Sequence, residues 1–217
     1  MKLIKYPQAC VLIETKEKRI LIDPGYFVYE HTNLTPDTWE GIDVLLLTHE
    51  HEDHADPEAV RTIVERNTPI VLTNAPVQKM LKEKLGIDAD VLLPGEERSV
   101  AGCSIRGVQS LHGPLPNGDL PPEVIGFLID NTILHPGDTV YIDPQVQAEV
   151  LLLPMCDTVT FSPNQAAAYA LRLQPKLVIP IHYHNERFLR DTSVMRRALQ
   201  NVNVPYKIMA DQEEIEL

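Results

Sequence analysis

The chain has 217 residues, of which 44% are hydrophobic and 23% are charged, as in an ordinary globular protein. This length fits a single domain over residues 1–217 and allows about 70% of the unfolded surface to be buried. No apolar run approaches the roughly 20 residues of a membrane span, and residues 1–15 lack a signal-peptide pattern. The net charge of −12 disfavours nucleic acid as a partner, because such a surface repels phosphate groups.

Cysteine usage indicates a reducing environment. Cys10, Cys103 and Cys156 are far apart in the chain and have no CxxC spacing. A disulfide framework is therefore not expected, and reduced thiols are typical of cytoplasmic proteins. We expect a cytoplasmic location, and the sequence does not predict an oligomeric state.

In the N-terminal half, short apolar runs alternate with charged or turn-forming residues, which predicts strands first and strand–helix units later. Asp56 and Pro57 predict a helix start, with an N-cap followed by proline at the first helical position. Gly86 is expected to end the second helix. Strands are expected at residues 3–4, 9–14, 20–22, 42–47, 70–73, 91–93 and 104–110, and helices at 58–67 and 75–85.

The C-terminal half begins with an expected loop over residues 111–122, which contains four prolines and two glycines. Asp130 and Asn131 predict the turn of a hairpin, and Ser162 with Pro163 predicts a helix start. This order of elements suits two sheets packed face to face with helices outside. Strands are expected at residues 124–129, 132–134, 150–153, 176–181 and 206–209, and helices at 163–173 and 192–200.

Residues 25–40 form an expected loop that is unusually rich in aromatic side chains, including Tyr26, Phe27, Tyr29 and Trp39. We interpret this loop as a lid or pocket wall. The alternative is a hydrophobic cover over the core.

The segment at residues 48–54, which reads THEHEDH, directly follows an apolar run. His49 and His51 are two positions apart, so their side chains leave the same face of an extended backbone. Asp53 and His54 follow where the chain must turn, and we expect them to point into a second, adjacent position. Imidazole and carboxylate at this density suit zinc, manganese or iron. The segment therefore predicts a metal site, against the alternative of a polar loop after a buried strand.

His112, Asp138 and His182 also follow predicted apolar strands. A single histidine at a strand end is more often structural than a ligand. Jointly the candidates are stronger, because five of the eight histidines of the chain follow predicted strands. We expect these segments to gather at one edge of the sheets.

In these motifs the chain resembles the metallo-β-lactamase superfamily: THxHxDH, a histidine after a strand, an aspartate in a GDT turn, and a late histidine. The resemblance extends from about residue 3 to residue 184, and it implies an α/β fold. More specifically, it implies a four-layer αββα sandwich with the metal site at one edge of the two sheets. Finer similarity to UPF0173 metal-dependent hydrolases and ascorbate-6-phosphate lactonase-like proteins lies in residues 9–14, 20–24, 134–139 and 178–183.

The resemblance implies two divalent metal ions held by seven side chains. We expect zinc, although manganese or iron suits the same ligands. An aspartate rather than a cysteine between the metals points away from the lactamases that open penicillin-like rings. The implied ligands are His49, His51 and His112 for one ion, Asp53, His54 and His182 for the other, and Asp138 as a bridge.

The predicted activity is hydrolysis of an ester, lactone, thioester or phosphoester bond in a small metabolite. Two metal ions that bridge a water lower its pKa toward about 7 and supply hydroxide at neutral pH. Asp53 is the expected catalytic residue, since it is placed to orient the hydroxide and accept its proton. The main alternative is an iron-dependent, dioxygenase-like oxidoreductase on the same fold. A non-catalytic member and a nucleic-acid-processing enzyme are weaker alternatives.

Further candidates flank these ligands. Asp23 is either an acceptor that fixes the tautomer of a ligand histidine or an ordinary turn residue. His135 either donates to a substrate oxygen or caps a turn, and Tyr183 and His184 are candidates to line the pocket.

The chain departs from the UPF0173-like branch at two positions near the expected rim of the site. Pro7-Gln8 stands where that branch usually has Gly-His before its second strand. Met155-Cys156-Asp157 stands where a glycine-rich segment is common. The substrate of a relative is therefore not carried over to this chain.

Overall fold

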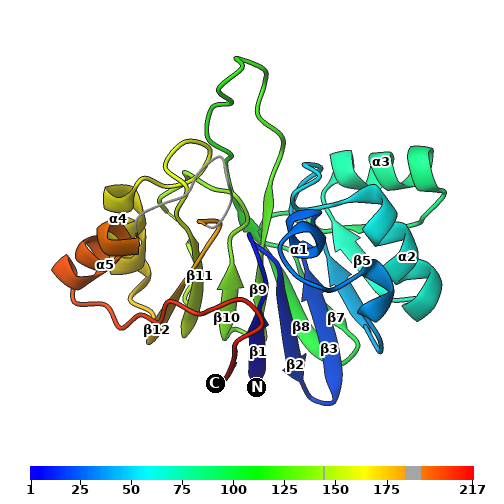
Figure 1. Cartoon of the computed structure of the whole chain (residues 1–217), viewed down its shortest axis with the longest axis horizontal. Helices are drawn as coiled ribbons and strands as arrows, with labels where there is room; N and C mark the ends of the chain where they lie inside the picture. Colours follow the sequence, from blue (N-terminus) through cyan, green and yellow to red (C-terminus); the bar gives the residue numbers. More distant parts are fainter. Residues whose placement is uncertain (144, 184–191) are drawn as a thin grey trace.

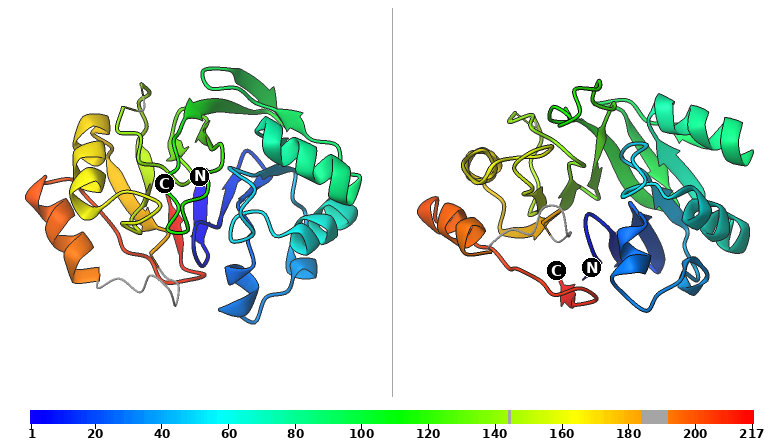
Figure 2. Two further views of the ribbon diagram at one scale, coloured as in Figure 1. Left: turned by 90° about the horizontal axis from the view of Figure 1, so that it is seen from above. Right: turned by 45° about the horizontal axis from the view of Figure 1, so that its top comes forward.

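Two β-sheets pack face to face and helices cover the outer face of each, which gives four layers (Figures 1 and 2). The computed structural model describes residues 1–143, 145–183 and 192–217. The layering confirms the expected αββα architecture. Within the described residues, no helix has the length and apolar character needed to cross a membrane.

The first sheet has seven strands in the order β13-β1-β2-β3-β4-β5-β6. Its β13, β1, β2 and β3 pair antiparallel, whereas β3, β4, β5 and β6 run parallel. The strands are β1 (Lys2–Lys5), β2 (Val11–Thr15), β3 (Lys18–Ile22), β4 (Val44–Leu46), β5 (Ile70–Thr73), β6 (Asp90–Val91) and β13 (Glu214–Glu216).

The second sheet has six strands in the order β12-β11-β10-β9-β8-β7. Its β10, β11 and β12 run parallel, and the remaining neighbours pair antiparallel. The strands are β7 (Glu97–Val100), β8 (Cys103–Gln109), β9 (Ile125–Ile129), β10 (Ile133–His135), β11 (Val150–Pro154) and β12 (Leu177–Ile181).

Helices α2 (Pro57–Asn67) and α3 (Ala75–Leu85) cover the first sheet, and α4 (Pro163–Leu173) and α5 (Thr192–Asn201) cover the second. The predicted N-caps explain where two of them begin. The Asp56 side chain accepts hydrogen bonds from two backbone amides of α2. Ser162 caps α4 in the same way, within a capping box.

Each central strand is buried on both faces, with side chains alternating between two cores. Val44 and Leu46 of β4 lie in the core between the sheets, whereas Leu45 and Leu47 lie in the core beneath α2 and α3. This period of two follows from the pleat of a strand. Burial on both faces explains why the sequence reads as a continuous apolar run before the histidines.

The predicted strand at residues 206–209 is wrong, because Tyr206 forms only an isolated bridge with Val178. Strands β7 and β13, which lie at sheet edges, were not predicted from the sequence. Both strands carry charged residues in their short sequences, which weakens the apolar signal. The predicted hairpin turn is confirmed, with Asp130 and Asn131 both at positive φ.

The aromatic loop contains the short helix α1 (Phe27–Glu30) and the 3-10 turn η1 (Pro36–Thr38). Trp39 is buried, and its Nε1 donates to the Tyr29 hydroxyl at 3.0 Å. The Trp39 ring also packs edge-to-face on Tyr6, with centroids 4.8 Å apart. These contacts favour the alternative of a hydrophobic cover over the lid or pocket wall.

Gly25, at the start of this loop, packs directly on the backbone of the histidine-rich segment. A Cβ at this position would lie 1.9 Å from the Asp53 carbonyl oxygen and 2.5 Å from the His54 nitrogen. No side chain larger than hydrogen fits without displacing both residues.

We expect Gly25→Ala to lower the free energy of unfolding by about 3 kcal/mol or more, because it forces backbone displacement in a packed region. Gly86→Ala is the control, since Gly86 has no atom within 4 Å of a built Cβ and the strain there comes from its positive φ alone. It should cost only about 1 kcal/mol. Urea unfolding of both variants measures the difference, and equal losses would contradict the proposed packing constraint.

Candidate metal centre

All seven predicted ligand residues converge at one edge of the two sheets. Four of them lie on the loop after β4, while the other three follow β8, β10 and β12. Ligand atoms from these residues form three groups within which every separation is 4.8 Å or less. The groups are His49, His51 and His112; His49, His54 and Asp138; and Asp53, His54 and His182.

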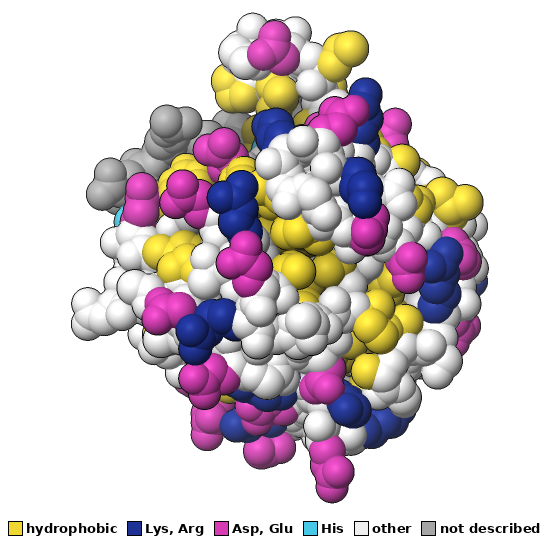
Figure 3. All heavy atoms as spheres, turned by 90° about the vertical axis from the view of Figure 1, so that its right-hand side faces the viewer, with side chains coloured by type: hydrophobic (Ala, Val, Ile, Leu, Met, Phe, Trp, Pro, Cys, Tyr) yellow, Lys and Arg dark blue, Asp and Glu magenta, His cyan; other side chains and the backbone are white. Residues whose placement is uncertain are grey.

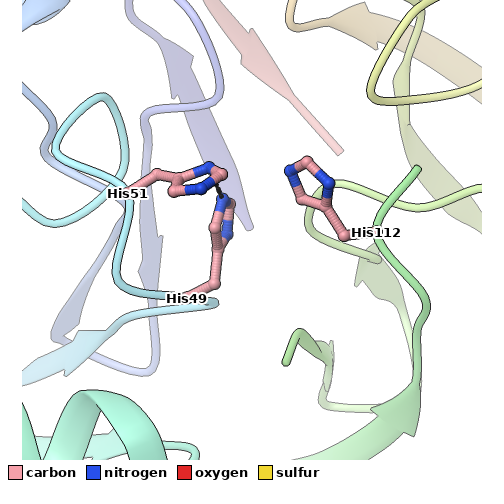
Figure 4. A group of neighbouring side chains, drawn as sticks. All are labelled: His49, His51 and His112. Atoms are coloured by element: carbon pink, nitrogen blue, oxygen red, sulfur yellow. Dashed lines mark hydrogen bonds between the residues drawn. The ribbon is translucent and has the colours of Figure 1, made fainter. Parts of the chain in front are cut away.

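The first group consists of His49, His51 and His112, whose rings point toward one another (Figure 4). His49 Nε2 lies 3.2 Å from His51 Nδ1. The His112 ring approaches from the opposite sheet, with its centroid 5.0 Å from that of His51 and 5.4 Å from that of His49. Two segments about sixty residues apart in sequence thus meet at one point.

Asp138 joins the two halves of the cluster. Its Oδ1 lies 3.4 Å from His54 Nε2, and its Oδ2 lies 2.9 Å from His182 Nε2 and 3.8 Å from His112 Nε2. Asp53 Oδ2 lies 3.7 Å from His54 Nε2 and 3.8 Å from His182 Nε2. Asp138 therefore contacts His112 of the first group and His54 and His182 of the third group, which is the geometry that a bridging ligand requires.

The histidines of the first group are poised to be neutral. Burial lowers the pKa of His49 well below its ordinary value, and burial also lowers the pKa of His51 and His112. A neutral imidazole retains the lone pair that binds a metal ion.

For His54 and His182, the cost of burying a charged ring is compensated by the neighbouring carboxylate of Asp138. Burial opposes protonation of His54 and His182, but Asp138 raises the pKa of His54 well above normal and that of His182 to about 10. Burial favours the neutral acid at Asp138, yet His182 and His54 hold the pKa of its carboxyl well below normal. The carboxylate of Asp138 is therefore charged at neutral pH.

The donor set fits divalent cations. Among the described residues, buried His54 Nε2, His112 Nε2 and Asp138 Oδ1 have no hydrogen-bond partner. Such orphaned buried polar atoms are costly, and two cations bridged by Asp138 would satisfy all three. Imidazole and carboxylate are suitable ligands for zinc, manganese and iron.

Asp23 has the position expected of a residue that fixes ligand orientation. Its buried carboxylate accepts from the Thr48 backbone amide at 2.8 Å, the Thr48 hydroxyl at 2.7 Å and His54 Nδ1 at 2.8 Å. Thr48 Oγ1 in turn lies 3.0 Å from His49 Nδ1. With both Nδ1 atoms engaged as donors, the Nε2 atoms of His49 and His54 are left for the cluster. This role of Thr48 was not predicted from the sequence.

Two of the site residues predicted from the sequence adopt the left-handed backbone region without being glycine. Asp23 has φ 49° and His182 has φ 55°. Such conformations cost free energy and persist where surrounding contacts impose them. Each residue directly follows a strand of a different sheet, so the left-handed turn directs its side chain across the edge.

The structure corrects two of the flanking candidates. His135 is fully buried; its Nε2 donates to the Ala9 carbonyl at 2.8 Å, and its Nδ1 accepts from the Gly137 amide at 3.2 Å. It therefore caps a turn, and the substrate-donor role is wrong. The Tyr183 hydroxyl donates to the Met209 carbonyl at 3.0 Å, and its ring packs in the core beneath α4 and α5. Tyr183 does not line the site, and His184 lies outside the described residues.

Gln8 is a site residue that the sequence analysis did not assign. It is only 1% exposed, and its Nε2 lies 2.9 Å from Asp53 Oδ2 and 2.9 Å from His182 Nε2. The available signal was the departure from Gly-His at Pro7-Gln8.

Comparison with known proteins agrees with this geometry. The model of the beta-lactamase superfamily domain matches residues 2–182. The chain belongs to the beta-lactamase superfamily. A UPF0173 metal-dependent hydrolase of Salinibacter ruber is 29% identical over 84% of this chain and 84% of that protein. The expected class, a metal-dependent hydrolase of the metallo-β-lactamase superfamily, is thereby confirmed.

Solved structures share the superfamily fold. The metallo hydrolase Igni18 of Ignicoccus hospitalis superposes with a TM-score of 0.77 at 22% identity, covering 99% of this chain and 97% of that chain. CmlA, a diiron beta-hydroxylase of Streptomyces venezuelae, superposes with a TM-score of 0.79 at 18% identity, covering 100% of this chain and 54% of that chain. The fold therefore occurs in proteins with different named activities.

We expect Asp23→Ala to weaken metal binding by about 10- to 100-fold, because His49 and His54 lose the partner that orients them. Competition with a chromophoric chelator measures the affinity on folded protein. Asp43→Ala is the matched control, since Asp43 accepts from the Arg19 amide at 2.9 Å and contacts no ligand residue. Unchanged affinity in Asp23→Ala would refute the orienting role.

Proposed function

We propose that this protein is a dinuclear metal hydrolase that cleaves an ester, lactone, thioester or phosphoester bond of a small metabolite. The observation that carries the proposal is the position of Asp138 between two groups of three ligands. His49, His51 and His112 would hold one cation, and Asp53, His54 and His182 the other. Zinc is the first candidate for both positions, because imidazole and carboxylate are its common ligands.

Divalent cations held by these residues would lower the pKa of a bound water and polarise the scissile oxygen of the substrate. The protein must orient that water and accept its proton. Asp53 suits this role because its side chain is 23% exposed, whereas that of Asp138 is 2% exposed. Of these two carboxylates, Asp53 is the one that can exchange a proton with solvent. We therefore assign Asp53 as both ligand and general base.

The proposed partner is a small molecule rather than a nucleic acid. On the face of the molecule that Figure 3 displays, lysine and arginine side chains of the described residues are interspersed with aspartate and glutamate, without a continuous basic area. Such a mixed surface provides little attraction for a phosphate backbone. Cys10, Cys103 and Cys156 are all buried thiols, which supports the proposal of a cytoplasmic location.

Metal analysis and a substrate panel test the proposed activity together. We expect close to two equivalents of zinc or manganese and hydrolysis of one class among lactones, thioesters, carboxyl esters and phosphodiesters. Chelator treatment should abolish turnover, and added metal should restore it. Protein with almost no metal after growth in ample zinc and manganese would remove the basis for the proposal. An iron-loaded, coloured protein that consumes oxygen would favour the oxidoreductase alternative.

Substitution of Asp53 tests the proposed general base. We expect Asp53→Asn to lower kcat by about 10²- to 10⁴-fold, because the amide cannot accept the proton. Steady-state kinetics at saturating metal measure the effect. The control is Glu52→Gln, which removes the exposed carboxylate of the preceding residue and should leave kcat unchanged. Full turnover in Asp53→Asn would exclude this role.

A further inference from the structure

Gln8 lies in the tight turn between β1 and β2, and its backbone directs its side chain into the metal cluster. The residue has φ 61°, and its carbonyl accepts the His182 amide at 2.9 Å. The left-handed backbone conformation costs free energy in a residue other than glycine, and the side chain of Gln8 does not itself require it. The backbone bond to His182 therefore fixes Gln8 beside one of the predicted ligands.

The amide end of Gln8 is placed as a ligand would be. Its nitrogen lies 2.9 Å from both Asp53 Oδ2 and His182 Nε2, and these two atoms are 3.8 Å apart. With metal–ligand bonds of about 2.1 Å, neighbouring ligand atoms lie about 3.0 Å apart in an octahedral site and about 3.4 Å apart in a tetrahedral site. The Gln8 amide atom thus lies at the octahedral spacing from each of the two predicted ligand atoms, which are themselves somewhat farther apart.

Hydrogen bonding alone does not satisfy Gln8. Its Oε1 is buried without a partner, although the residue is 1% exposed. His182 Nε2 also lies 2.9 Å from Asp138 Oδ2, and a His182 ring protonated at Nε2 donates to that carboxylate. The Gln8 amide nitrogen then faces a second donor.

Turning the amide over does not resolve the conflict. Rotation by a half-turn about the last side-chain bond exchanges Oε1 and Nε2 without moving the rest of Gln8. Oε1 would then lie beside Asp53 Oδ2, so that two acceptors face each other. A cation held by Asp53 and His182 removes both conflicts, because all three atoms can direct lone pairs to it.

We propose that Gln8 is an additional ligand of the second metal position, through Oε1. This inference rests on the proposed dinuclear site. It gives the second position five protein ligands, against four at the first when Asp138 is counted in both. A neutral oxygen and a higher coordination number favour manganese or iron(II) at the second position more than at the first.

The proposal is tested by titrating the chelator-stripped full chain with Mn²⁺ and measuring binding by calorimetry and by equilibrium dialysis. Gln8→Met keeps the size of the side chain but has no oxygen. We expect this substitution to raise one of the two dissociation constants for Mn²⁺ by at least about 10-fold and to leave the other unchanged. The same substitution should weaken Zn²⁺ binding less than Mn²⁺ binding. Gln174→Met is the matched control, since Gln174 also has positive φ and lies at the exposed end of α4.

Gln8→Glu separates a ligand from a residue that merely donates to Asp53. Glutamate cannot donate to Asp53 but offers a charged oxygen to the cation, so we expect Mn²⁺ affinity at this position to be retained or increased. A loss equal to that in Gln8→Met would overturn the proposal and show an orienting donor. Two unchanged dissociation constants in Gln8→Met would overturn it as well. A parent protein that binds fewer than two ions would instead overturn the dinuclear site, and the ligand role with it.

Discussion

The hydrogen bonds that Asp23 makes with Thr48 and His54 are the constraint on which the site depends. One carboxylate receives the Thr48 amide, the Thr48 hydroxyl and the His54 ring, and Thr48 passes the constraint to His49. A single buried acid at the end of β3 therefore orients one histidine of each ligand group. The fold makes this possible because β3 and β4 are parallel neighbours, so both end at the same edge.

The two halves of the cluster differ in how their burial is tolerated. Removing charge from water is expensive unless the charge is paired, whereas a neutral imidazole can be buried more cheaply. His49 and His112 are buried as neutral imidazoles, while His54 and His182 are paired with the carboxylate of Asp138. Metal binding needs the lone pair of a neutral imidazole in both halves, so the halves differ in how their histidines are paired and not in the ligand atom that they offer.

Strand periodicity predicted two packed sheets and the position of the histidine-bearing segments at a sheet edge. The resemblance to the metallo-β-lactamase superfamily supplied the set of seven ligands. An apolar run identifies a buried strand, and a polar residue just beyond it lies at the sheet edge. The edge strands β7 and β13 were missed since they are short and mostly polar or charged, so neither contains an apolar run. The segment near Tyr206 was mistaken for a strand; it lies beside β12 but forms only one bridge with it.

Side-chain direction near the site was less predictable than position. His135 lies three residues before Asp138 and at the end of a strand, yet its ring turns to the Ala9 carbonyl. Tyr183 directly follows His182, but its ring packs in the core beneath α4 and α5. Gln8 reaches the cluster only because its backbone adopts the left-handed region. One-residue differences of this kind depend on the local dihedral angles, which residue patterns do not specify.

The outermost strands bear on how the protein behaves in concentrated solution. Exposed strand edges offer unpaired amides and carbonyls to another molecule, which is a common route to aggregation. Here β6 has only two residues, β7 and β13 carry charges, and the backbone of residues 205–207 hydrogen-bonds to β12 at Val178. None of the four sheet edges within the described residues presents a long apolar template, so the sandwich resists growth into fibrils.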